Sequence, residues 1–222
     1  MRSNRRMAQV NELLRTLLPR SGEGWLSEES IDDKKRLEKD RVWVVDPLDG
    51  TREFIAGIPE WCVSIGFVMG GHAVAGGILN PTTGERFLGE VGRGVTLDGR
   101  PVSTTAVTEL SGARVLASRS EVHRGEWARF EDVRFDIRTV GSVAYKLALV
   151  AAGRAEATWT LTPKNEWDVA AGVALLHAAG GRATLPGGGE RRFNQADPLL
   201  SGLLASWAGL LPAIQNLLLH ES

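Results

Sequence analysis

The stretch of sequence that decides this fold reads Trp43-Val44-Val45-Asp46-Pro47-Leu48-Asp49-Gly50-Thr51-Arg52-Glu53-Phe54. Residues 43–45 are apolar and mostly β-branched, which predicts a short buried strand. The pairs Asp46-Pro47 and Asp49-Gly50 are typical of turns, so we expect the strand to end there. Two carboxylates three residues apart therefore leave the end of a strand on one tight loop.

The composition of this loop favours a site for a metal ion and a phosphate. Pro47 fixes one φ angle, and Gly50 allows backbone N–H groups to face a ligand. Oxygen ligands on a rigid turn suit Mg²⁺, and free amides at the helix start that Thr51 can cap suit a phosphate. The alternative is a plain Asp/Gly surface loop, which would be the better interpretation of an isolated Asp-x-x-Asp. The buried strand directly before the loop favours the binding site.

The overall composition is that of an ordinary globular protein. The chain has 222 residues, enough for one large or two small domains, with 43% hydrophobic and 24% charged residues. Its formal net charge of -1 gives no reason to expect a nucleic-acid polymer as partner, and no apolar run is long enough to span a membrane. No secretory signal is predicted, and the single cysteine, Cys62, excludes an internal disulfide, which fits a cytoplasmic protein. The charge-dense stretch 31–41 is expected to be a mobile surface loop.

Three motifs resemble one known family. Asp46-Pro47-Leu48-Asp49-Gly50-Thr51, followed by Phe54, resembles the signature of the inositol monophosphatase superfamily. Residues 167–172 and 178–181 resemble its second signature, and Glu28 resembles the first glutamate of a family block that binds metal. Members of this superfamily are Mg²⁺-dependent, commonly lithium-sensitive phosphatases. The resemblance covers nearly the whole chain except its beginning.

The pattern of apolar residues predicts two halves. Residues 1–111 are expected to hold a helix at 7–18 and then an antiparallel sheet. Residues 112–222 alternate strands with helices, which predicts an α/β half with a mixed sheet, and the polar stretch 104–112 is the candidate boundary. This order agrees with the layered αβαβα sandwich, of α+β or α/β class, that the resemblance implies. The N-terminal helix of the family is missing from the first half.

The resemblance implies a cluster of metal ligands: Glu28, Asp46, Asp49, Asp168 and the carbonyl of Leu48. Four acids in one cleft would repel each other without cations, so the cluster itself implies bound metal, and the resemblance implies two or three Mg²⁺ ions. Taken alone, Asp168 is better explained as a cap of the helix that it begins, whereas the resemblance favours a metal ligand, and both roles can coexist. Bound Mg²⁺ would neutralise a phosphate, lower the pKa of a bound water and stabilise the leaving oxygen.

The resemblance also assigns roles around these ions. The expected catalytic residues are Thr51, Glu28 and Asp46. The expected substrate-binding residues are Gly50, Thr51, Gly141, Ser142 and Lys164. The hydroxyl of Thr51 would orient the attacking water, and its amide would help to hold the phosphate. Lys164 is expected to meet a second phosphate or, equally well, to be a solvated loop lysine.

The beginning of the chain departs from the family pattern. A family aspartate that hydrogen-bonds the threonine of the signature is replaced by Asn4 or Arg5, and the preceding helix and lysine have no counterpart. Either the given start lies downstream of the true one, or the chain is naturally short. The alternative to an active phosphatase is therefore a catalytically impaired relative that binds metal and phosphate.

The substrate is predicted from differences between subfamilies. Inositol monophosphatases have a glutamate that contacts the inositol ring at the position of Leu161, which cannot accept a hydrogen bond. Residues 49–55, 118–120 and 163–168 resemble the 3'(2'),5'-bisphosphate nucleotidases. We therefore favour a Mg²⁺-dependent phosphomonoesterase that converts 3'-phosphoadenosine 5'-phosphate to AMP and phosphate, with inositol 1-phosphate or another sugar phosphate as the alternative. The expected partner is a small phosphorylated metabolite, and the resemblance also implies a homodimer.

Overall fold

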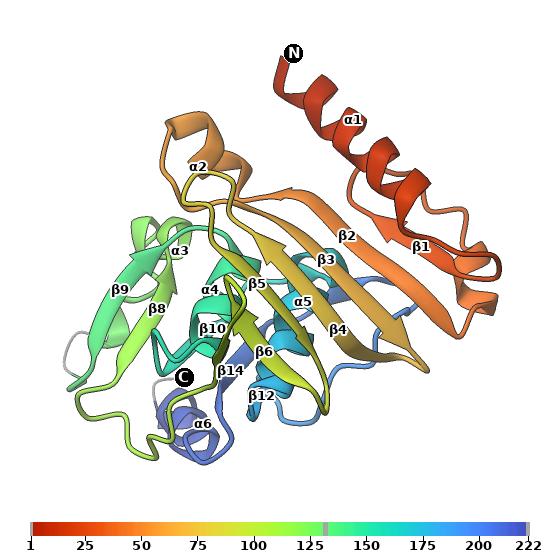
Figure 1. Ribbon diagram of the computed structural model, residues 1–222. Helices are drawn as coiled ribbons and strands as arrows, with labels where there is room; N and C mark the ends of the chain where they lie inside the picture. The colour runs from red at the N-terminus through yellow and green to blue at the C-terminus, as the bar shows by residue number, and fades with distance from the viewer. Residues whose placement is uncertain (1, 131–132, 221–222) are drawn as a thin grey trace.

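The computed structural model describes residues 2–130 and 133–220 and contains two large sheets with helices between and outside them (Figure 1). Sheet A has seven strands in chain order: β1 (Gly24–Ser27), β2 (Arg41–Asp49), β3 (Cys62–Met69), β4 (His72–Leu79), β5 (Arg86–Glu90), β6 (Gly94–Leu97) and β7 (Arg100–Val102). Neighbouring strands are antiparallel except β1 and β2, which are parallel. The predicted antiparallel sheet is therefore confirmed apart from this pair, where residues 28–40 return the chain to the same end of the sheet.

Strand β2 extends further than the sequence predicts. Its pairing with β3 continues past Asp46, opposite Ser64, to Asp49, opposite Cys62, with a register shift between the two pairs. The predicted strand end was wrong because Pro47, which has no N–H for the ladder, is accommodated in a bulge. In a regular strand two residues three apart point to opposite faces, so the extra residue of the bulge is what allows both carboxylates to serve one site.

Sheet B confirms the predicted mixed sheet of the second half. Its strand order is β12-β14-β10-β8-β9, with β8 parallel to β9 and β10 and the other pairs antiparallel. The strands are β8 (Arg114–Ser118), β9 (Asp136–Val140), β10 (Ala157–Thr160), β12 (Gly181–Thr184) and β14 (Leu203–Trp207). The sequence did not predict the short elements α3 (Arg119–His123), η2 (Ala128–Phe130), β11 (Lys164–Asn165) and β13 (Leu199–Leu200).

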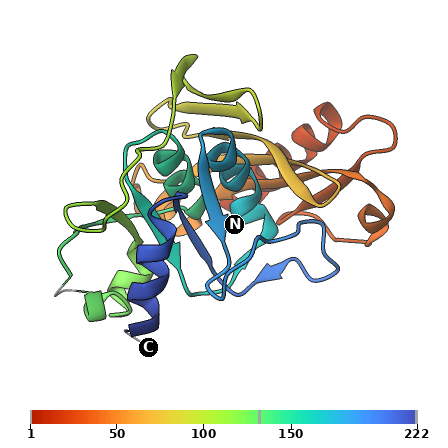
Figure 2. The same ribbon diagram turned by 90° about the horizontal axis from the view of Figure 1, so that it is seen from below.

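Two helices, α4 (Val143–Ala151) and α5 (Glu166–Ala178), form the layer between the sheets (Figure 2). Small residues let α5 approach sheet A closely, because a Cβ atom on Gly76 would lie 2.3 Å from the carbonyl oxygen of Ala171. Helix α6 (Leu211–His220) covers the other face of sheet B through a second apolar cluster. Together with α1 (Arg2–Leu17) outside sheet A, these layers confirm the αβαβα sandwich.

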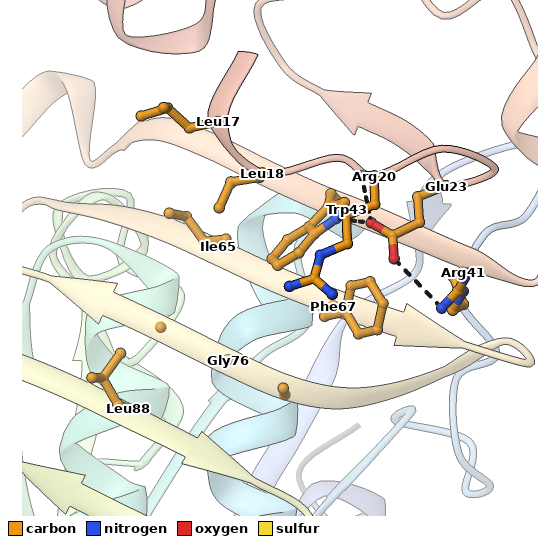
Figure 3. Close-up of a pocket in the computed structure, with 12 residues that line it drawn as sticks. Leu17, Leu18, Arg20, Glu23, Arg41, Trp43, Ile65, Phe67, Gly76 and Leu88 are labelled. Carbon is orange, nitrogen blue, oxygen red and sulfur yellow. Dashed lines mark hydrogen bonds and ion pairs between the residues drawn. The ribbon is translucent and has the colours of Figure 1, made fainter. Parts of the chain in front are cut away.

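The outer face of sheet A is only partly covered. Helix α1 packs beside β1 and β2, and an apolar hollow of about 720 Å³ remains over the neighbouring strands (Figure 3). Trp43 and Phe67 form part of its floor, with ring centroids 4.7 Å apart. Glu23 closes one end by accepting a hydrogen bond of 2.8 Å from Nε1 of Trp43. Glu23 is the only carboxylate among the residues that line this hollow, so the predicted acidic cluster lies elsewhere.

The stretch 31–41 is mostly exposed, as a surface loop should be, but one of its side chains is buried. It contains η1 (Lys35–Glu38), and the side chain of Arg36 is only 1% exposed. Its guanidinium donates to both carboxylate oxygens of Asp32 and to the side-chain oxygen of Asn194. The sequence did not predict this burial because Asn194, which accepts from Arg36, lies 158 residues away. Within the two described ranges, none of the helices has both the length and the apolarity needed to cross a bilayer.

Candidate active site

Four acidic side chains from separate segments gather near the bulged end of β2. Asp46 and Asp49 belong to β2, Glu28 follows β1 directly, and Asp168 lies in the first turn of α5. The parallel register pairs Ser27 with Val45, which places Glu28 beside Asp46. The Glu28 carboxyl is within hydrogen-bonding reach of that of Asp46. The structure therefore brings together the four acids that the sequence predicts as metal ligands.

A backbone amide fixes one carboxylate oxygen of Asp46 and one of Asp168. Oδ1 of Asp46 accepts a hydrogen bond of 2.8 Å from the Leu48 amide. Oδ2 of Asp168 accepts one of 2.8 Å from the amide of Asn165, so the predicted capping role is also present. The Asp46 carboxyl also meets that of Glu28, so a proton or a cation must lie between these two acids if both are to stay close. One oxygen of Asp46 and one of Asp168 are thus fixed by the backbone.

Asp49 is anchored by the start of α4. Its Oδ2 accepts 2.5 Å from Oγ of Ser142 and 2.6 Å from the amide of Ala144. Ser142 itself has a positive φ of 54° and caps α4 by accepting from the amide of Tyr145 at 2.9 Å. Ser142, a predicted substrate-binding residue, lines the cavity beside Asp49, and its hold on Asp49 was not predicted.

Burial and mutual repulsion make these acids hard to ionise. Burial, followed by the charges of Asp49 and Glu28, raises the pKa of Asp46 well above its ordinary range. Burial and then Asp49 raise the pKa of Asp168 to about 7. Burial also raises the pKa of Glu28 and of Asp49. Of the ion pairs in residues 2–130 and 133–220, none involves any of the four acids.

The donor set fits a hard divalent cation. All side-chain donors are carboxylate oxygens, and the carbonyl of Leu48 adds a fifth oxygen that accepts from Oγ1 of Thr51 at 3.2 Å. Among the described residues, no three His, Cys, Asp or Glu side chains lie close enough together to hold one metal ion as they stand. Buried carboxylates repel each other when no cation is bound, and a bound Mg²⁺ ion would remove that repulsion.

A cavity of about 300 Å³ adjoins Asp49. Four predicted substrate residues line it: Gly50, Thr51, Ser142 and Lys164. Gly50 has a φ of 95°, a conformation that suits glycine, and directly precedes α2 (Thr51–Ala56). The cavity is also lined by residues that the sequence did not single out, among them Arg124, Lys146 and Thr162. Lys146 could have been noticed as the one charged residue of an otherwise apolar helix.

Other predicted residues lie away from this cavity. The amide of Gly141 donates to Oε2 of Glu60 at 2.7 Å, and a Cβ atom there would lie 2.3 Å from the Glu53 side chain. Gly141 therefore allows close packing behind the cavity wall. Leu161, whose position suggested exclusion of inositol, lines a separate hollow beside α6. The structure does not describe the side chains of Asn4 and Arg5. The predicted loss of water activation at these positions therefore stays a prediction.

Known proteins resemble this chain along most of its length. The profile named "Inositol monophosphatase family" matches residues 4–219. Inositol monophosphatase 3 from Solanum lycopersicum is 35% identical over 163 residues, 69% of this chain and 60% of that protein. Inositol monophosphatase from Anabaena (Nostoc) sp. PCC 7120 has a TM-score of 0.80 at 28% identity, covering 96% of this chain and 84% of that one. A 2'AMP-bound SaIMPase-II has a TM-score of 0.80 at 26% identity, covering 96% and 81%. The match thus spans about three-fifths of the length of the Solanum lycopersicum relative.

Proposed function

Because this chain belongs to the inositol monophosphatase family, we propose that it is a metal-dependent phosphomonoesterase acting on a small phosphorylated metabolite. One observation carries the proposal. Asp46, Asp49 and Asp168 each hold one carboxylate oxygen in a hydrogen bond to the protein, and with Glu28 they form a group of acids whose pKa values burial raises. Asp49 borders a cavity with lysines on its wall. Such a cluster is costly without cations, and cations are what a phosphate monoester needs in order to be attacked.

We propose that two or three Mg²⁺ ions bind at the acidic cluster. The proposed ligands are Glu28, Asp46, Asp49, Asp168 and the Leu48 carbonyl. When bound, Mg²⁺ supplies charge neutralisation for the phosphate and an acidified water. Thr51 would orient that water, since its hydroxyl already contacts the Leu48 carbonyl, and the amides of Gly50 and Thr51 would hold phosphate oxygens.

Within this class we favour a 3'(2'),5'-bisphosphate nucleotidase. Lys164 lines the cavity with its side chain only 16% exposed, which supports contact with a ligand over the solvated alternative. The related SaIMPase-II binds 2'AMP, a nucleotide. Inositol 1-phosphate is the second candidate, because relatives are named inositol monophosphatases and Leu161 does not line the cavity.

Release of inorganic phosphate tests the proposed function. Purified protein with Mg²⁺ would be offered 3'-phosphoadenosine 5'-phosphate and inositol 1-phosphate in parallel, beside Asp46→Asn and the surface control Glu109→Gln. We expect Mg²⁺-dependent release from the nucleotide that Asp46→Asn abolishes and Glu109→Gln retains. Release from inositol 1-phosphate alone would select the second candidate. Metal binding by calorimetry with no release from either would identify a catalytically impaired relative.

A further inference from the structure

Glu28 is the one acid of the cluster that no other kind of group holds in place. Backbone amides bind Asp46 and Asp168, and Ser142 with an amide of α4 binds Asp49. In the described part of the chain, the Glu28 carboxyl reaches only that of Asp46, a second acid. The position of this carboxyl in the site therefore depends on the backbone that carries it.

That backbone is a tight turn, which begins at the last residue of β1. The amide of Ser30 donates to the carbonyl of Ser27 at 3.3 Å, and the amide of Glu29 donates to Oγ of Ser27 at 3.4 Å. Both bonds are longer than the range of about 2.7–3.2 Å that is usual for N–H···O bonds, so they constrain the turn weakly. A further support is needed to hold the Glu28 side chain in one place.

Asn11 of α1 provides this support. Its Oδ1 accepts from Oγ of Ser27 at 2.7 Å, and its Nδ2 donates to Oγ of Ser30 at 2.9 Å. Nε1 of Trp25 donates to the same Ser30 hydroxyl at 3.2 Å. Asn11 is 1% exposed and Ser27 2% exposed, so water does not compete for these bonds. One buried amide thus joins the residue before Glu28 to the residue two positions after it.

Asn11 is the polar exception on an apolar helix face. Met7, Leu14 and Leu18 share this face at helical spacing, and Met7 is buried like Asn11. Burying an amide is unfavourable unless hydrogen bonds compensate its lost hydration, so packing alone would favour an apolar residue at position 11. Among the α1 side chains that the structure describes, Asn11 is the only one with a hydrogen bond to another element. The turn around Glu28 accounts for the polar residue.

We propose that Asn11 is a positioning residue for Glu28: its amide fixes the turn 27–30, so that the Glu28 carboxyl is presented to the metal site beside Asp46. This inference rests on the proposed metal-dependent function and adds to it a residue that touches neither metal nor substrate. Because Asn11 belongs to α1, full metal affinity also depends on the contact of α1 with the turn. Groups that orient a metal ligand in this way typically change metal affinity by about 10- to 100-fold.

Magnesium titration by calorimetry tests the proposal. Asn11→Leu keeps a similar volume without the two hydrogen bonds, and we expect it to weaken Mg²⁺ binding by about tenfold or more. The matched control is Met7→Ala, one turn away on the same face, which loosens the packing of α1 without touching the turn. It should keep the wild-type affinity. Equal weakening in both variants would show that Asn11 acts only through the packing of α1 and would refute a positioning role.

A double-mutant cycle shows whether Asn11 acts through the turn. Ser27→Ala should also weaken Mg²⁺ binding, and the double variant with Asn11→Leu should bind no more weakly than the worse single variant, because the two side chains act as one unit. Independent, additive losses would overturn the proposal. Ser30→Ala removes the other partner of Asn11 and gives the same comparison if circular dichroism shows that Asn11→Leu does not fold.

Hydrogen exchange in EDTA separates this proposal from the proposed function, because it needs neither metal nor substrate. We expect the amides of Glu29 and Ser30 to exchange faster in Asn11→Leu than in wild type by about tenfold or more, the loss of a typical buried hydrogen bond, while the amides of β3 are unchanged. Unchanged exchange in the turn would refute this inference alone. Absence of Mg²⁺ binding in the wild type would instead refute the proposed function, and with it Glu28 as a ligand.

Discussion

Because burial raises the pKa values of the clustered acids, we expect the metal-free protein to lose stability as the pH rises. The pKa of Asp168 is about 7 in the folded protein and 3.8 ordinarily. Below pH 3.8 both states carry the proton, and between 3.8 and 7 the folded state must keep a proton that the unfolded state has released. Stability therefore falls with pH across this window, and the penalty is complete above pH 7. About three pH units at about 1.4 kcal/mol each give a total of about 4 kcal/mol, of which about 2.5 kcal/mol falls between pH 5 and 8.

Urea unfolding in EDTA at several pH values measures this effect. The variant Asp168→Asn keeps an oxygen that can accept from the Asn165 amide but has no proton to lose. We expect it to gain about 2.5 kcal/mol relative to the wild type between pH 5 and 8, while the surface variant Glu109→Gln follows the wild type. Saturating Mg²⁺ should stabilise the wild type more at pH 8 than at pH 5, because protons compete with the metal. Parallel pH profiles for Asp168→Asn and wild type in EDTA would refute the reasoning.

Three further substitutions probe the supports of the site and the fold. Ser142→Ala removes a helix cap and the hydroxyl that holds Asp49, a proposed metal ligand, so unfolding should show a loss of about 1–2 kcal/mol. Calorimetry should show a weaker Mg²⁺ affinity, and unchanged affinity would contradict the anchoring role. Gly76→Ala places a Cβ atom 2.3 Å from a carbonyl of α5 and should cost about 2 kcal/mol or more in thermal unfolding, whereas Gly187→Ala, with open space around it, should not. Arg36→Met removes the buried guanidinium that joins Asp32 to Asn194, although Asp32 keeps Lys34 as a partner, and should lose about 1–2 kcal/mol in urea unfolding; a loss no larger than that of the exposed Lys35→Met would show that this network is dispensable.

Local sequence patterns were sufficient for most of the elements. The pair Asp98-Gly99 has φ angles of 51° and 79° and joins β6 to β7, as a tight hairpin requires. Gly141-Ser142 precedes α4 as a cap, and the apolar stripe beginning near Asp168 is α5, which starts two residues earlier than Asp168 itself. These features depend on residues a few positions apart, so the chain itself displays them.

Long-range pairings were not visible in the sequence. Ser142 holds Asp49 from 93 residues away, and Arg36 reaches Asn194 across 158 residues. The bulge at Pro47 depends on how β3 pairs with β2, which no pattern within β2 reveals. The four acids were found by motif resemblance, but which oxygen of each is free follows only from these tertiary contacts.

The position of β1 at the margin of sheet A has a consequence for the order in which the site assembles. Asp46, Asp49 and Asp168 are mounted on central elements, whereas Glu28 follows a four-residue strand bonded along one side only, to β2. Edge strands open locally more often than central strands do. Glu28 would therefore be the last of the four acids to take its place in the site during folding, and the first to lose it on local opening. Deuterium uptake by the amides of β1 should therefore slow when Mg²⁺ is added, while uptake by β3 stays constant. The exchange rate of one short strand would then report occupancy of the site with no substrate present.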